Sequence, residues 1–433
     1  MLARLRVVGW TSTLLAVGAC ESASTSAPDA AIDAAADSGG YTNTPVRPTH
    51  ELGLPVFYLD VDQGINDADY TPATLSYDGH EYFGAQAKYR GATSQGYPKR
   101  SLTLKLDKND RFTDEAHEFR SVRRLVLTST FDDSSQIRQR LAFELWNRLD
   151  PHHIAIHHFN AVVYLNGTYH GIYVATDHVN DDFLEQRGLP ANVNMYKARL
   201  KEANFRLTDR HGEPKQRLRA GYTKEEGSPA ADEPEAYADL EALLSWVATS
   251  DDADFRDNFA ARLTPDFLHW FIFVTLSQAV DTTTKNYFLV HDARPEAPDA
   301  RWRVIPWDFN ASFGQGAITQ RRAPDYWTVA RFGRANRLFE RMMGEPTLRA
   351  PLMQRFREAV QGVWTEAEIG LTLERYAGEV EAAAERDELR WGEARRANFS
   401  DRRDWTSPSE ELAYLRAWVP ARWRKISEEL ASE

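Results

Sequence analysis

Two acidic residues in the C-terminal half have surroundings that suit a metal-assisted reaction at a hydroxyl group. Asp281 follows a long apolar segment, and Asn286 comes five residues later. Asp308 follows the predicted strand 301–305, and Asn310 comes two residues after it. Carboxylate and amide oxygens are ligands that the hard cation Mg²⁺ accepts, and a carboxylate beside a hydroxyl can orient it or take its proton.

This order of residues is the one that protein kinases use. In a kinase the first Asp orients or deprotonates the acceptor hydroxyl, while an Asn and a second Asp hold magnesium against the phosphates of ATP. A kinase also pairs a Lys on an early strand with a carboxylate on the following helix. Lys99 and Lys105 precede the predicted helix that carries Glu144, so they have the required order. Arg138 on that helix is a further candidate for a phosphate contact.

The elements around these residues predict an α+β fold. Alternating apolar and polar residues indicate half-buried strands, and Asn166-Gly167 between two apolar runs indicates a hairpin. Apolar residues spaced by four from Ile137 indicate a helix that ends before Pro151. The other predicted helices are 236–249, 265–280, 337–362, 366–390 and 409–432. The predicted strands are 55–60, 82–89, 101–106, 124–128, 161–165, 169–174, 286–290 and 301–305.

Several short segments, taken together and in order, resemble the CotH kinase family. They are residues 88–94, 98–106, 132–138, 164–173, 194–197, 281–289, 305–310 and 312–314. The resemblance spans about residues 50–430. It implies a bilobal, atypical protein-kinase-like fold with a β-rich N-lobe at 50–185 and a mainly helical C-lobe at 186–433. It also implies phosphorylation of Ser or Thr hydroxyls on a secreted or coat protein, with ATP and Mg²⁺ or Mn²⁺.

By this resemblance Asp281 is the catalytic residue, and Asn286, Asp308 and Asn310 are the metal ligands. Lys99 lies in a segment typical of the family and is the preferred cation for the phosphates, with Lys105, Arg138 and Glu144 as its alternatives or partners.

The sequence also departs from the kinase pattern. No His-Arg pair precedes Asp281, Lys285 directly precedes Asn286, and no glycine-rich phosphate loop is present. Relatives often have a second Asp where Asn310 stands, and an amide brings no negative charge to a metal. Two alternatives therefore stay open: a catalytically weak kinase-like surface or adhesion protein, and an enzyme that transfers AMP.

The first 49 residues predict export and a membrane anchor. Arg4 and Arg6 precede an apolar run that is too short to span a bilayer comfortably, so residues 1–19 are expected to be a signal peptide. The residues before Cys20 resemble a bacterial lipobox, which predicts a lipidated Cys20. Residues 20–49 are poor in large apolar side chains and predict a flexible linker. The expected location is the bacterial cell envelope, facing the periplasm or the cell surface.

Composition narrows the remaining function classes. The 433 residues include 52 Lys and Arg against 64 Asp and Glu, a net charge of −12, which argues against a nucleic-acid partner. The single cysteine excludes an intrachain disulfide and a zinc site built on thiolates. The hydrophobic fraction of 42% is enough for a large core. We therefore expect an anchored, extracytoplasmic enzyme that acts on a protein substrate.

Overall fold

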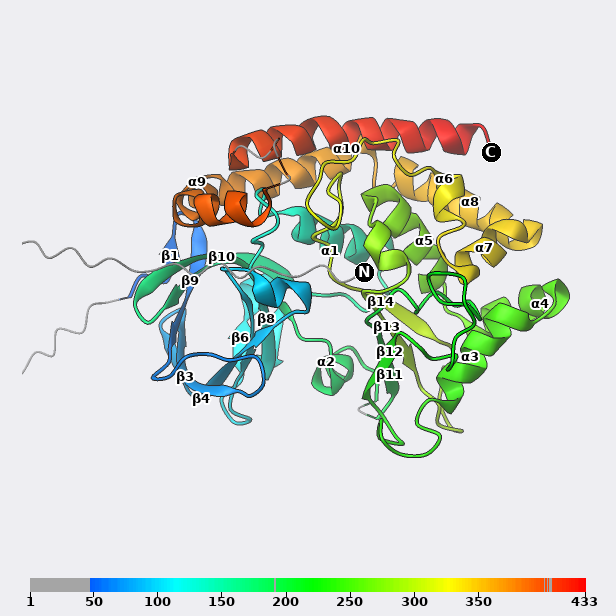
Figure 1. Cartoon of the computed structure of the whole chain (residues 1–433), viewed down its shortest axis with the longest axis horizontal. Coiled ribbons are helices and arrows are strands. Elements are labelled where there is room, and N and C mark those ends of the chain that lie inside the picture. Colours follow the sequence, from blue (N-terminus) through cyan, green and yellow to red (C-terminus); the bar gives the residue numbers. More distant parts are fainter. Residues whose placement is uncertain (1–46, 191, 401, 403, 405–406) are drawn as a thin grey trace, which may run out of the picture. The chain divides into compact units, whose positions relative to one another are not determined.

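Strands of the N-terminal half form a closed ring in this computed structural model, which describes residues 47–190, 192–400, 402, 404 and 407–433 (Figure 1). The strand order is β1-β2-β3-β4-β5-β8-β10-β9, and β9 also pairs with β2. This last pairing is parallel, with Val56 opposite Val162, whereas the other pairings in the ring are antiparallel. The sheet is thus closed like a barrel, which leaves few unpaired strand edges.

The bounds of the strands are as follows. The ring and its edge strand contain β1 (His50–Glu51), β2 (Leu54–Asp60), β3 (Thr71–Tyr77), β4 (His80–Arg90), β5 (Ser101–Lys105), β8 (Arg124–Thr128), β9 (His158–Leu165) and β10 (Thr168–Asp177). A short hairpin consists of β6 (Phe112–Asp114) and β7 (Phe119–Val122). A second sheet, in the order β12-β11-β13-β14, contains β11 (Asn194–Ala198), β12 (Tyr222–Glu226), β13 (Tyr287–His291) and β14 (Arg303–Pro306).

Alternation along the strands fills the ring with apolar side chains. Leu102 and Leu104 of β5 join one buried cluster with Phe57 of β2. Phe112 and Phe119 from the short hairpin belong to the same cluster, and their rings lie 5.7 Å apart. Because successive side chains of a strand point to opposite faces, the residues between these positions lie on the outer face of the ring.

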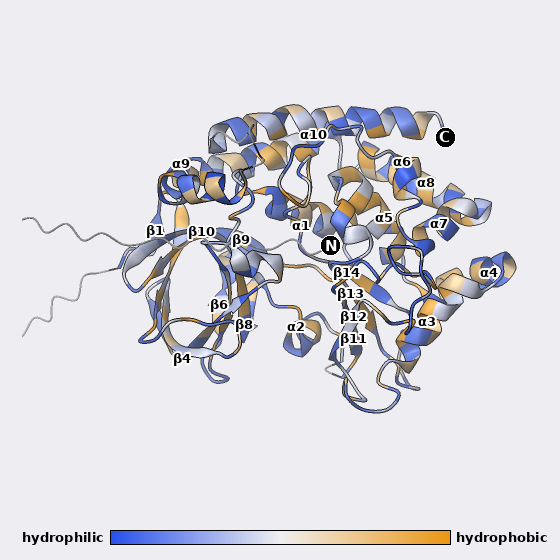
Figure 2. Cartoon of the chain, viewed as in Figure 1, coloured by the Kyte–Doolittle hydropathy of each residue, from blue (hydrophilic) through white to orange (hydrophobic). Residues whose placement is uncertain are grey.

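The helices and the second sheet share a separate and larger core. The helices are α1 (Arg138–Leu149), α2 (Asp181–Gln186), α3 (Ala238–Thr249), α4 (Asp252–Arg262), α5 (Asp266–Ser277), α6 (Val329–Phe332), α7 (Arg337–Gly344), α8 (Pro346–Gln361), α9 (Glu366–Asn398) and α10 (Pro408–Ala431). Nearly every residue of α5 is buried, so it has no polar face to direct toward water. Figure 2 shows both blue and orange bands on α10, as expected of a helix with one buried face.

Helix α9 joins the helical core to the ring. Ala383 and Ala384 pack against Ile172 of β10 and Val162 of β9, and their small size permits a close approach. One helical turn after Ala383, Asp387 is fully buried against β10, where its carboxylate accepts a hydrogen bond from the Ile172 amide. The helix is therefore fixed to the ring by apolar packing and by a buried carboxylate.

The fold agrees with the predicted class and hairpin and differs from the sequence prediction in one long helix. The α+β class and the hairpin at Asn166-Gly167 are confirmed. The single helix predicted over residues 337–362 is wrong, because α7 ends at Gly344 and α8 begins at Pro346. The predicted signal peptide, Cys20 and all but the last residues of the predicted linker lie outside the described residues.

Candidate active site

The pairing of β13 with β14 brings the two predicted acidic loops together. Tyr287 of β13 is opposite Pro306 of β14, so the residues before β13 adjoin the residues after β14. The Trp307 amide donates a 2.8 Å hydrogen bond to the carbonyl oxygen of Asn286, which extends this pairing by one step. Asn286 and Asp308 both have a left-handed backbone, with φ of 59° and 63°, so the chain turns sharply at both positions.

Asp281 is held within the same group by two contacts. It lies in a short 3₁₀ turn that follows α5. Its Oδ2 atom is 2.5 Å from the Lys285 Nζ atom and accepts a 3.3 Å hydrogen bond from the Asn286 side chain. The side chains of Asp281 and Asn286 are therefore adjacent.

Asp308 lies at the centre of these charges. Desolvation by the surrounding protein raises the pKa of its carboxyl group and the charge of Asp281 adds to the rise, whereas Lys285, Arg90 and Lys197 oppose it. The side chain itself is exposed, so water partly screens these effects. A carboxylate that is accessible and has both acids and cations close by is suited to bind a cation or to face a charged substrate.

A further acid, Asp132, adjoins Asn310. The Asn310 side-chain amide donates a hydrogen bond to the Asp132 Oδ2 atom. Burial raises the pKa of Asp132 to about 6, the hydrogen bond from Asn310 lowers it, and the charge of Asp308 raises it. We call Asp132, Asp281, Asn286, Asp308 and Asn310 the acidic group.

Basic side chains from the ring and from the second sheet are near the acidic group. Arg90 ends β4, and its positive charge acts on Asp308. Lys197 of β11 is close to both Arg90 and Asp308. Burial lowers the pKa of Lys197 to about 8, the charge of Arg90 lowers it further, and the charge of Asp308 opposes the change. Buried nitrogens of Arg90, Arg124 and His178 have no hydrogen-bond partner among the described residues. These unsatisfied nitrogens indicate a place where an anion could be bound.

The structure does not place Lys99 as predicted. It precedes β5, is fully buried, and donates a 2.6 Å hydrogen bond to Asp387 of α9. Burial lowers its pKa to about 8, and Asp387 opposes that change. Glu144 instead accepts hydrogen bonds from Arg375 and Tyr376 of α9, so the expected Lys99–Glu144 pairing is wrong. The reason is that Glu144 faces α9, whereas Lys99 reaches a different part of the same helix.

The other two predicted cations have different surroundings. Arg138 is fully buried, and its guanidinium is 2.6 Å from Asp133 and 2.5 Å from Glu411, so its charge is already paired. Lys105 is half-buried on the outer face of β5, and its Nζ atom is 5.3 Å from the centre of the Tyr70 ring. Of these two residues, only Lys105 stays near enough to solvent to approach a ligand.

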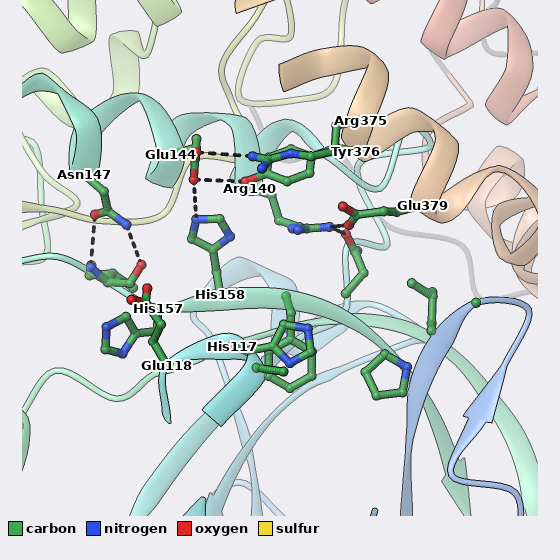
Figure 3. Close-up of a pocket in the computed structure, with 17 residues that line it drawn as sticks. His117, Glu118, Arg140, Glu144, Asn147, His157, His158, Arg375, Tyr376 and Glu379 are labelled. Atoms are coloured by element: carbon green, nitrogen blue, oxygen red, sulfur yellow. Dashed lines mark hydrogen bonds and ion pairs between the residues drawn. The ribbon is translucent and has the colours of Figure 1, made fainter. Parts of the chain in front are cut away.

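A cavity of about 430 Å³ lies elsewhere, between α1, α9 and the beginning of β9 (Figure 3). Glu144 lines it, but no member of the acidic group is among its described lining residues. Arg140, which also lines it, is 2.6 Å from Glu379. Because its buried charges are paired within the wall, we do not assign this cavity to the reaction.

The described residues have neither a ready-made metal cluster nor a membrane-spanning helix. They contain no group of three or more His, Cys, Asp or Glu residues placed to hold a metal ion. They also contain no helix with the length and apolar character that a membrane span requires.

Comparison with known proteins places the chain in a family. The family model described as "CotH kinase protein" matches residues 87–426, well over half of the sequence. The chain belongs to the CotH kinase family. It is similar to the inner spore coat protein H of Bacillus subtilis (strain 168), with 24% identity over 326 residues, which cover 73% of this chain and 84% of that protein. The CotH match includes the whole acidic group together with Arg90 and Lys197, whereas β1, β2 and β3 precede it.

Sequence reasoning did not select Arg90, Asp132 or Lys197 as site residues. All three lie in segments that resemble the CotH family, at residues 88–94, 132–138 and 194–197, so a signal was present. Lys197 comes late in the chain compared with a strand Lys of a protein kinase. It nevertheless reaches the acidic group, because β11 pairs with β13.

Proposed function

We propose that this protein transfers the γ-phosphate of ATP to Ser or Thr hydroxyls of a protein outside the cytoplasm. The observation that carries the proposal is that the acidic group lies beside several cations, one of which, Arg90, has a buried nitrogen without a hydrogen-bond partner among the described residues. Carboxylates suit Mg²⁺ or Mn²⁺, and guanidinium and ammonium groups suit phosphate oxygens. The description of the matched family, CotH kinase protein, supports the same class of reaction.

The residues fit a divalent cation that is bound together with a nucleotide. Mg²⁺ keeps several waters and takes only one or two carboxylates plus the substrate phosphates, so a cage of three acids is not required. Asp308 supplies an accessible carboxylate, and Asn286 is adjacent to it. We propose these two residues, with Asn310, as the metal ligands; the bound cation would neutralise charge on the phosphates.

The other residues take roles that follow from their positions. Asp281 would orient the acceptor hydroxyl and accept its proton, because it is the acid next to Asn286 and Asp308. Arg90 from the ring and Lys197 from the second sheet would bind phosphate oxygens. Lys285, which contacts Asp281 and acts on Asp308, would stabilise charge that develops on the transferred phosphoryl group.

The proposal extends to the fold and the location. The closed ring and the helical half would correspond to the N-lobe and C-lobe of an atypical kinase-like fold, at residues 50–185 and 186–433. Lipidation at Cys20 would anchor the protein to the membrane at the cell envelope, with residues 20–49 as a linker. Its substrate would then be a protein on the same side of the membrane.

The test is a transfer assay with the full-length protein. The protein is incubated with Mn²⁺ and ATP labelled on the γ- or the α-phosphate, with dephosphorylated casein and the chain itself as acceptors. We expect label from the γ-phosphate on Ser or Thr. Removing a general base or an electrostatic contact typically costs about 10²–10³-fold in rate, so Asp281→Asn and Asp308→Asn should each lose at least that much. Glu185→Gln on α2, which removes a charge outside the acidic group, should keep full activity.

The other outcomes decide between the alternatives. Label from the α-phosphate would identify transfer of AMP and overturn phosphoryl transfer. No label from either position, together with no metal-dependent binding of ATP, would leave a kinase-like binding protein and contradict the enzymatic proposal.

A further inference from the structure

Asn310 contacts an acidic residue, Asp132, that the sequence pattern does not identify. Its amide donates a hydrogen bond to Asp132, although the two residues are 178 positions apart. Asp132 lies between β8 and α1, whereas Asn310 lies in the loop after β14. The amide two residues after Asp308 is therefore in direct contact with a carboxylate from another part of the chain.

Gln315 holds the backbones of Asp132 and Asn310 together. Its side-chain amide donates 2.9 Å hydrogen bonds to two backbone carbonyl oxygens, those of Asp132 and Asn310. Gln315 is only 4% exposed, so replacing these bonds with water is difficult. The two loops are thus tied at the positions that bring Asp132 and Asn310 together.

The next residue anchors the Asp132 loop to the helical core. Asp133 accepts hydrogen bonds from the backbone and side chain of Arg138, at 3.0 Å and 2.6 Å. The guanidinium of Arg138 also donates a 2.5 Å hydrogen bond to Glu411 of α10. The loop is therefore held rigidly, as expected where a ligand must be presented in one position.

Of the buried acids among the described residues, only Asp132 and Asp266 have no cationic partner within ion-pair distance. Asp133, Asp387 and Glu411 are each within 2.9 Å of an Arg or Lys nitrogen. Asp132 is only 8% exposed and forms no such ion pair within the described part of the chain. Because buried charges are normally paired or bound to metal, the carboxylate of Asp132, which lies beside the rest of the acidic group, is suited to take a cation from outside the protein.

We propose that Asp132 is a metal-binding residue that supplies the second carboxylate of the site, beside Asp308. This inference rests on the proposed function. Asn310 then serves as the link between Asp132 and the loop of Asp308, and the neutral side chain at position 310 does not leave the site short of charge. One or two carboxylates with an amide oxygen form the kind of set that Mg²⁺ and Mn²⁺ take together with phosphates.

The test measures metal binding directly. Free Mn²⁺ is followed by electron paramagnetic resonance during titration of the full-length protein, alone and with the ATP analogue AMP-PNP. Altering even the residues that support a metal ligand costs about 10–100-fold in affinity, so Asp132→Asn should weaken Mn²⁺ binding at least tenfold. Asp308→Asn should do the same, and Glu185→Gln should have no effect.

An exchange of charge tests the geometry more strictly. The double variant Asp132→Asn with Asn310→Asp moves the carboxylate to its neighbour and should recover most of the lost affinity. Asn310→Asp alone places two acids in contact, so it should lower the melting temperature without metal and raise the stabilisation by Mn²⁺. This second variant keeps the proposal testable if Asp132→Asn does not fold.

The possible failures are distinguishable. If Asp308→Asn weakens Mn²⁺ binding but Asp132→Asn and the charge exchange have no effect, Asp132 is not a ligand and the proposed function stands. If the wild-type protein binds no Mn²⁺ even with AMP-PNP, both the metal site and the proposed function are overturned.

Discussion

Arg90 and Lys99 are both cations of the β4–β5 region, yet their surroundings give them different tasks. Lys99 is enclosed, and its ammonium group is bound to Asp387. Arg90 is only half-buried, keeps an unsatisfied nitrogen, and acts on Asp308. A cation that already has a buried partner stabilises the fold, whereas a cation with free donors beside a site can bind an anion.

Lys99→Met should therefore lower stability. It removes one partner of a buried ion pair, which typically costs about 3–5 kcal/mol, although Arg395 still contacts Asp387. Urea unfolding would measure the loss. Lys105→Met, on the neighbouring and more exposed surface, is the matched control and should change the free energy of unfolding by less than about 0.5 kcal/mol. A stable Lys99→Met protein that no longer binds ATP would restore the role predicted from the sequence.

Arg90→Met should weaken nucleotide binding and leave stability nearly unchanged. Hydrogen bonds to charged groups contribute about 1.5–3 kcal/mol, so the affinity for AMP-PNP should fall about 10–100-fold while the melting temperature changes little. Calorimetric titration with Mn²⁺ present would measure it. Unchanged affinity would show that the phosphates do not contact this face of the ring.

The β9–β10 hairpin and α9 meet at Gly171. Its φ is +128°, and a Cβ atom there would lie 2.5 Å from the Asp387 Oδ1 atom and 2.7 Å from the Lys99 Cε atom. Only glycine therefore allows the strand to approach the buried ion pair. This contact joins the ring to the helical half without any part of the candidate active site.

Gly171→Ala should consequently be more damaging than Gly167→Ala in the same hairpin. Both positions have positive φ, which costs about 1–2 kcal/mol for a side chain, but a Cβ atom at Gly167 meets nothing within 4 Å. Overpacking adds about 1–3 kcal/mol at Gly171 alone. Equal losses in the free energy of unfolding for the two variants would contradict the crowding at Gly171.

The elements also show which features a sequence can predict. Alternation identified β2, β4, β5 and β8, because half-buried strands carry that period. Closure of the ring was not predicted, since the parallel pairing of β2 with β9 joins segments about a hundred residues apart and leaves no local pattern. Arg90, Asp132 and Lys197 lie in segments that resemble the family, but only the tertiary structure shows that their charges act near Asp308. Asp281 and Asn286 could be proposed from the sequence because their spacing follows the order of residues in kinases, and the structure places their side chains in contact.

For the whole molecule, buried histidines make stability depend on pH. His153 lies 2.9 Å from His269 of α5, and burial lowers the pKa of each to about 4. Since the unfolded value is about 6.5, the unfolded chain binds more protons between these values. This contribution to stability is complete above pH of about 6.5 and is lost as the pH falls toward 4. Asp177 and Asp266, with pKa raised to about 6, act in the opposite sense.

His269→Gln should flatten this dependence, because it removes one of the protons taken up on unfolding. The change in slope is about 1.4 kcal/mol per pH unit per proton near pH 5. Urea unfolding at several pH values between 7 and 4.5 would measure it. His152→Gln, at an exposed histidine outside the buried pair, is the control and should leave the slope as in the wild type. The same slope in both variants would show that the buried pair does not titrate.

The proposed anchor determines which substrates the whole molecule can reach. A lipidated Cys20 followed by a linker of about thirty residues would keep the folded part near one membrane face, where the ATP concentration is the limiting condition for a kinase. A single chain gives only marginal membrane binding, so stable attachment requires the two acyl chains of a diacylglycerol. Cys20→Ser should move the protein from the detergent-extracted membrane fraction to the soluble fraction, measured by immunoblot, with transfer activity per molecule unchanged. If the variant stays in the membrane fraction, the protein is retained by another contact and the lipoprotein assignment fails, while the proposed reaction is untouched.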